Sequence, residues 1–183
     1  GSIADYEGLK KKFFFFFFTV GSLSTLSLAF VPDGNWVMLL MVYTITVVGF
    51  HGANIFYDAF LVDVTPEHRM DNISARGFGL GYIGSAIPFI ISIAIILLAE
   101  NGVLPISMTI ATKLAFVITA IWWITFTVPM LKNVIQIHSV PRESSIIVGS
   151  FRRLSNTFKD IRKYRHVFLF LIAYFFYIDG VGT

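Results

Sequence analysis

Long apolar stretches separated by short polar segments dominate the chain. Largely uncharged residues fill positions 13–30, 36–62, 77–98 and 105–131, and a fifth stretch starts at 167 and runs to 183. A helix needs about 20 such residues to cross a bilayer, and an isolated strand cannot satisfy its backbone groups in lipid. The pattern therefore predicts an all-α integral membrane protein, with four complete membrane helices and the start of a fifth.

The polar segments between these stretches predict how the chain is organised. The sequence "VPDGN" at 31–35 carries Pro and Gly, which are typical of a tight turn. We expect a loop at 1–12, four helices within 13–131, a linker at 132–166 and the first part of another helix at 167–183. Because the chain opens on Gly1 and stops inside an apolar stretch, we expect it to be a piece of a longer protein.

The positions of lysine and arginine predict the orientation. Basic residues collect in the short cytoplasmic loops of membrane proteins. If the first helix starts on the cytoplasmic side, 13 of the 14 Lys and Arg residues lie there and only Lys113 lies outside. We therefore expect 1–12, 63–76 and 132–166 to be cytoplasmic in a multi-pass protein of the plasma membrane.

Composition excludes several other classes of protein. Hydrophobic residues make up 56% of the chain and charged ones 14%, where soluble domains carry about 25% charge. The absence of cysteine excludes disulfides and thiolate chemistry. No Gly-x-Ser-x-Gly elbow, His-Glu-x-x-His helix or glycine-rich phosphate loop occurs, and the four histidines are scattered. We expect no enzyme, no cofactor and no metal site.

The first twelve residues, "GSIADYEGLKKK", contain a recognisable motif. Gly8 allows a tight turn, and Asp5 can pair with a cation or a helix N-terminus. The stretch resembles the loop signature of the major facilitator superfamily, Gly-x-x-(Ala)-Asp-x-x-Gly-x-(Lys/Arg)-(Lys/Arg), between that fold's second and third helices. The resemblance implies a part in conformational gating for Gly1, Asp5, Gly8, Lys10 and Lys11.

Six phenylalanines follow the motif, at 13–18. Six consecutive residues cover every face of a helix and encode no single site. We expect most of them to face lipid.

Two further stretches narrow the resemblance. The segments "NISARGFGLGYIGSAIPF" (72–89) and "FLIAYFFYIDGVGT" (170–183) look like the vacuole-effluxer-like branch of the superfamily, which is related to a fungal vacuolar amino-acid effluxer. The resemblance implies helices 3 to 7 of a helical bundle that moves a small solute, with amino acids as candidates, by alternating access. Many proton-driven members carry an Arg followed closely by Gly in the fourth helix, and "YTITVVGFHGANIFYDAF" (43–60) has no Arg, which counts against proton antiport by that route.

Ionisable residues are few within the predicted spans, and each is costly in lipid. His51, Asn54 and Asp58 follow one another at i, i+3 and i+7, so they share one face of a helix. They form either a hydrogen-bonded seam between helices or part of a substrate or proton pathway.

Helix arithmetic adds Asp179 to this pathway. Asp179 follows position 167 by 12 residues and His51 precedes position 63 by 12, so each lies about 18 Å from the cytoplasmic boundary, near the midplane. Solute sites of such transporters lie at that depth, where a carboxylate can meet an ammonium or carry a coupling proton or cation. Asp58 is shallower and fits a gate. The alternative for Asp179 is a buried carboxyl satisfied by a neighbouring helix.

The third apolar stretch contains Gly77, Gly81 and Gly84. The small-x-x-x-small spacing of Gly77 and Gly81 favours close helix packing over a contact with substrate.

The linker has apolar residues at alternating spacings of four and three among basic ones: Ile147, Phe151, Leu154, Phe158 and Ile161. This predicts an amphipathic basic helix on the cytoplasmic membrane surface, while nucleic-acid binding is disfavoured between two spans.

The sequence thus leaves two functions open. The first is a secondary transporter whose partners are a small solute, the bilayer and a coupling ion. The second is a non-transporting membrane scaffold or receptor, whose polar residues would serve helix contacts alone.

Overall fold

The structure, a computed structural model, describes residues 6–139, 149–150, 152, 155–157, 159, 161 and 164–182, with the backbone alone for 165 and 179–182. This described part is helical and contains no strand, which confirms the all-α class. Its elements are α1 (Leu9–Leu28), α2 (Trp36–Ala59), α3 (Leu61–Val64), the 3₁₀ turn η1 (Glu67–Arg69), α4 (Met70–Glu100), α5 (Met108–Asn133) and α7 (Arg165–Gly182).

Local signals set the helix starts. Gly8 precedes α1 with a φ of 71°, and Gly34 turns the chain before α2 with a φ of 82°. The Asn35 side chain then accepts a hydrogen bond from the Met38 N–H at 3.1 Å, and Ser107 caps α5 through the Ile110 N–H at 3.3 Å. Such caps satisfy N–H groups that have no partner within the helix.

Helix α4 begins seven residues before the predicted apolar stretch, at Met70 instead of 77. The polar residues before Gly77 include no proline, so the helix extends beyond its lipid-length part. The apolar count marked only the portion suited to the bilayer.

Among the described residues, three helical segments are long and apolar enough to cross a membrane: Trp36–Val64, Glu67–Glu100 and Met108–Asn133. Helix α1 has 20 residues but carries three lysines in its first turn, and its crossing of the bilayer stays a prediction. The C-terminal apolar helix His166–Ile178 is shorter.

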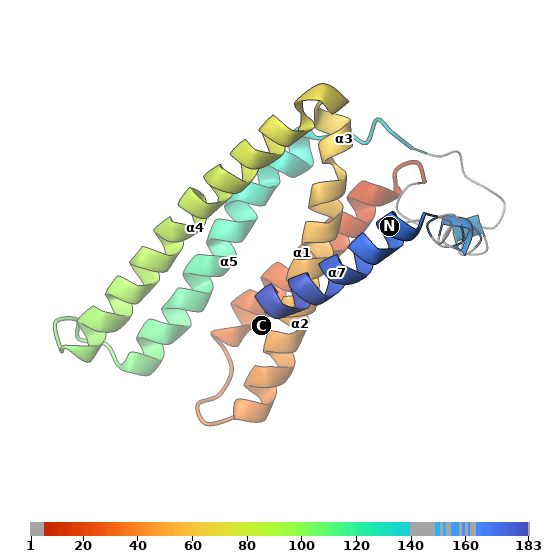
Figure 1. The fold of residues 1–183 in the computed structure, drawn as a ribbon. Helices are drawn as coiled ribbons and strands as arrows, with labels where there is room; N and C mark the ends of the chain where they lie inside the picture. Colours follow the sequence, from red (N-terminus) through yellow and green to blue (C-terminus); the bar gives the residue numbers. More distant parts are fainter. Residues whose placement is uncertain are drawn as a thin grey trace.

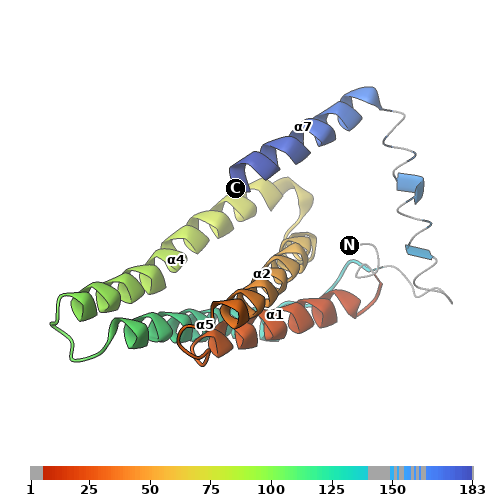
Figure 2. The same ribbon diagram turned by 90° about the horizontal axis from the view of Figure 1, so that it is seen from below.

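The long helices pack as neighbours in the order α2, α1, α5 and α4. Helices α1 and α2 form one antiparallel pair, and α4 and α5 form a second (Figure 1). The view from below shows α5 lying along α1 (Figure 2). The core cluster lies between α1 and α2 and consists of Phe14, Phe18, Ala53, Phe56 and Phe60.

The phenylalanine run is less lipid-facing than the sequence suggested. Phe14 and Phe18 are buried, and Phe13 and Phe17 pack against the same cluster. Only two of the six, Phe15 and Phe16, are exposed by more than half. The expectation that most of them face lipid was wrong, because residues of α2 and α5 pack against four of the six rings.

Two glycines let α1 and α2 approach closely. A Cβ atom on Gly49 would lie 2.5 Å from the Cα of Gly21, closer than real side chains come. In the described part, nothing lies within 4 Å of a Cβ placed on Gly77, Gly81 or Gly84, so close packing at those three positions stays a prediction.

Candidate functional site

A buried ion pair joins the start of α1 to the end of the α2–α3 segment. The Lys10 Nζ lies 2.7 Å from Asp63 Oδ2, and the two side chains are 5% and 0% exposed. The same ammonium donates to the Ala59 carbonyl at 3.0 Å and lies 5.3 Å from the centre of the Phe60 ring. Lys10 therefore has a charge partner, a hydrogen-bond acceptor and an aromatic face.

An interruption of the helix at Phe60 positions Asp63 for this contact. Helix α2 ends at Ala59, and the short α3 turns Asp63 toward α1. An uninterrupted helix would direct position 63 differently, so the break is part of the site.

The other oxygen of Asp63 holds the segment that follows α5. Asp63 Oδ1 accepts hydrogen bonds from the Ile137 N–H at 3.0 Å and the His138 N–H at 2.7 Å. The His138 ring contacts the same oxygen through Nδ1 at 3.3 Å. Both carboxylate oxygens are thus satisfied, which a buried charge requires.

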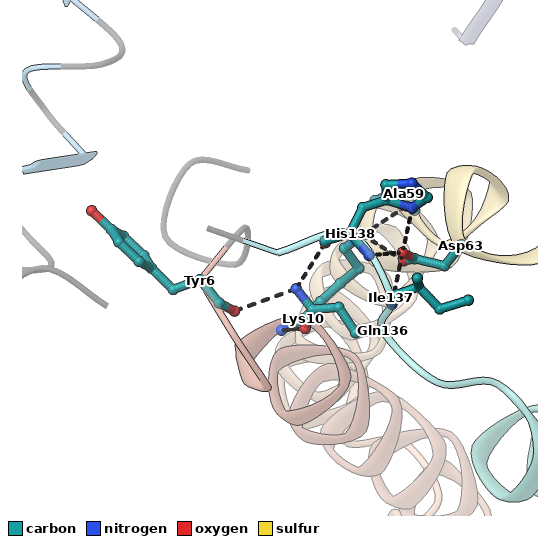
Figure 3. A network of polar contacts seen from close by, with 7 residues as sticks. All are labelled: Tyr6, Lys10, Ala59, Asp63, Gln136, Ile137 and His138. Atoms are coloured by element: carbon teal, nitrogen blue, oxygen red, sulfur yellow. Dashed lines mark hydrogen bonds and ion pairs between the residues drawn. The ribbon is translucent and has the colours of Figure 1, made fainter. Parts of the chain in front are cut away.

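Gln136 connects the same segment to the start of α1 through hydrogen bonds. Its Oε1 accepts from the Lys10 N–H and its Nε2 donates to the Tyr6 carbonyl, each at 3.3 Å. Lys11 Nζ donates to the Val134 carbonyl at 2.8 Å. We call Tyr6, Lys10, Ala59, Asp63, Gln136, Ile137 and His138 the Lys10–Asp63 network (Figure 3).

The network links three parts of the chain at one end of the helices: the loop before α1, the end of α2–α3 and the beginning of the linker. A buried ion pair stabilises a fold weakly compared with apolar packing, but losing one partner is strongly destabilising. We therefore expect this pair to favour one specific arrangement of α1, the α2–α3 segment and the segment after α5.

The predicted pathway residues on α2 lie away from this network. His51 and Asp58 are exposed and Asn54 is half-buried, whereas Ala53 and Phe56 on the same helix face α1. The His51 ring packs edge-on against Phe50, with the ring centres 5.5 Å apart. Within the described part of the chain, no side-chain hydrogen bond or ion pair joins His51, Asn54 or Asp58 to another side chain. All three residues belong to the single helix α2, and whether they form a seam between helices or a pathway stays a prediction.

Several predicted residues cannot be placed. Gly1 and Asp5 lie outside the described residues. So do four of the five apolar residues of the predicted linker helix: Ile147, Phe151, Leu154 and Phe158. Asp179 lies on α7 (Arg165–Gly182), at one of the positions for which only the backbone is described. Its proposed meeting with His51 remains a prediction.

Asp63 was missed as a site residue by sequence reasoning, which used it only as a boundary. The signal was an acidic residue directly after an apolar span, on the side where the lysines collect. The close approach at Gly49 was also missed, although Gly49 and Ala53 show the small-x-x-x-small spacing.

The opposite end of the helices carries a simpler contact. Lys113 Nζ lies 2.7 Å from Asp33 Oδ1, with side chains 34% and 68% exposed. Such exposed pairs contribute little to stability. Within the described residues, no three His, Asp or Glu side chains gather as metal ligands would.

Comparisons with known proteins show the family of the chain. A family described as "Vacuole effluxer Atg22 like" matches residues 1–68 and 62–183. The chain is 62% identical over 183 residues to the "Uncharacterized MFS-type transporter YxiO" of Bacillus subtilis, covering all of this chain and 43% of that protein.

Fungal relatives are more distant. The chain is 30% identical to "Autophagy-related protein 22-2" of Penicillium rubens over 135 residues, which are 65% of this chain and 22% of that protein. It is also 30% identical to "Autophagy-related protein 22" of Yarrowia lipolytica over 142 residues, with 64% and 23% covered. The chain thus spans less than half the length of these relatives. No solved structure gives a significant match.

Proposed function

Because the chain belongs to the vacuole effluxer Atg22-like family of the major facilitator superfamily, we propose that the full-length protein is a secondary transporter that moves a small solute by alternating access. Amino acids are the substrate class we propose first, from the resemblance to the fungal effluxers. Because the relative with 62% identity is bacterial, we propose the plasma membrane as its location.

The observation that carries this proposal is the Lys10–Asp63 network. Alternating access requires groups of helices that move as units, with discrete polar contacts that hold each arrangement. The network fastens the ends of α1 and α2–α3 to the segment that enters the linker. Three motif residues lie at this end of the molecule. Gly8 turns the chain before α1, Lys10 pairs with Asp63, and Lys11 donates to the Val134 carbonyl.

We propose that Asp5 completes the gate by pairing with a helix end or a basic residue in one conformation. Asp5→Asn in the full-length protein should slow transport while expression stays normal. Unchanged transport kinetics would remove Asp5 from the gate.

The accessible face of α2 supplies the proposed solute pathway. His51 and Asn54 would line a central cavity together with Asp179 of α7, and Asp58 would lie nearer the gate. Asp179→Asn should abolish uptake or change its pH dependence, whereas Asp58→Asn should mainly change the rate. In this proposal the Asp179 carboxylate would also be the group that carries a coupling proton or binds a coupling cation.

Reconstitution tests the proposed function. The full-length protein in liposomes should move at least one member of a radiolabelled amino-acid panel faster than protein-free liposomes do. Residues 1–183 contain no cysteine, so engineered cysteines in this part can be labelled selectively once any cysteine elsewhere in the full-length protein has been replaced. Water-accessible labelling at positions 51, 54 and 58 supports a cavity, while protection at all three together with no flux for any solute would favour the scaffold.

A further inference from the structure

A groove of about 690 Å³ lies between the start of α1 and the end of α5. Its lining includes Glu7, Lys11, Lys12, Phe15, Leu131 and Ile135. It is separate from the polar face of α2, and it borders the Lys10–Asp63 network through Gln136.

The two lysines leave donors available in this groove. Lys12 is exposed and has no hydrogen bond or ion pair among the described residues. Lys11 donates one hydrogen bond to the Val134 carbonyl. An ammonium group has three donors, so Lys11 can still bind an anion.

Apolar side chains lie next to these charges. Phe15 follows Lys11 by four residues and Lys12 by three, so it is on the same side of α1, one turn further along the helix. Phe15 is 54% exposed and Ile135 is 71% exposed. The groove therefore offers cationic groups at the helix end and open apolar surface beside them.

Lysine ammonium groups beside exposed apolar side chains favour a ligand that has both an anionic group and a hydrocarbon chain. A free anion gains nothing from the apolar surface, and a simple hydrocarbon chain gains nothing from the lysines. A phospholipid has both parts, and anionic lipids are attracted to basic residues at the cytoplasmic surface. We propose that the groove binds an anionic phospholipid, with its headgroup phosphate on Lys11 and Lys12 and an acyl chain along Phe15 and Ile135.

Native mass spectrometry of the full-length protein in detergent, titrated with phosphatidylglycerol or phosphatidylcholine, tests this site. The wild-type protein should retain phosphatidylglycerol preferentially. Lys12→Gln should lower that affinity roughly 5-fold, and the further change Lys11→Gln should lower it again by a similar factor. Lys12→Arg, which keeps the charge, should bind as the wild type does.

Lys132→Gln is the matched control, because Lys132 is exposed at the end of α5 but does not line the groove. It should leave lipid retention unchanged. Equal retention of the two lipids, or an equal loss with Lys132→Gln, would show diffuse surface attraction and overturn the site. Displacement of the lipid by millimolar inorganic phosphate would assign the lysines to a free anion instead. The proposal depends on the membrane orientation and not on transport activity.

Discussion

At the scale of single residues, Asp63 supplies the counter-charge for a Lys10 ammonium that is almost fully buried. Leaving one such charge unpaired costs about 3–5 kcal/mol. We therefore expect Asp63→Asn to lower the thermal unfolding temperature of the purified full-length protein substantially. A detergent thermal-shift assay measures this.

The double variant Lys10→Met with Asp63→Leu is the control for this prediction. It removes both charges and should recover much of the loss, although the Ile137 and His138 N–H groups still lose their acceptor. The single variants Lys10→Met and Asp63→Leu complete the comparison. If the losses of unfolding temperature in these two simply add up to the loss in the double variant, the pair is not coupled.

Gly8 offers a second residue-scale test, because its φ of 71° is unfavourable for residues with a Cβ atom. Nothing lies within 4 Å of a Cβ at this position, so the cost comes from the backbone alone. Gly8→Ala should destabilise the protein by about 1 kcal/mol. Gly8→Asn should cost less, since Asn tolerates this conformation. Equal thermal shifts for Ala and Asn would contradict the backbone explanation.

At the scale of helices, the α1–α2 crossing depends on the contact between Gly21 and Gly49. A methyl group on Gly49 meets backbone atoms that cannot rotate away, and overpacking of this kind costs about 1–3 kcal/mol. Gly49→Ala should therefore lower the unfolding temperature. Val48→Ala, at an exposed neighbouring position, should change it little. Similar effects of the two substitutions would mean that the helices do not cross this closely.

At the scale of the whole molecule, the two ends of the helices differ in charge. One end has the Lys10–Asp63 network and leads into the basic linker, and the other has, among the described residues, the exposed Lys113–Asp33 pair. We expect reporter fusions at Asp33 and Ser145 to lie on opposite sides of the membrane, with Ser145 cytoplasmic. Both reporters on one side would refute the predicted orientation.

Much of the fold was predictable from local sequence, because helix formation in lipid depends on length, apolarity and breakers within each segment. The apolar stretches, the turn at 31–35 and the lysine asymmetry all required only neighbouring residues. The motif also identified Gly8, Lys10 and Lys11, and helical periodicity placed His51, Asn54 and Asp58 on one face.

Tertiary structure decided which of these features meet. Lys10 and Asp63 are 53 positions apart, and Asp63 and His138 are 75 apart, so their contacts depend on how helices pack and on the break at Phe60. Six identical phenylalanines have no periodicity that could separate Phe14 from Phe15. Sequence by itself determined the helices and their apolar character. Only packing determined the faces they share, because burial depends on the atoms that distant segments bring together.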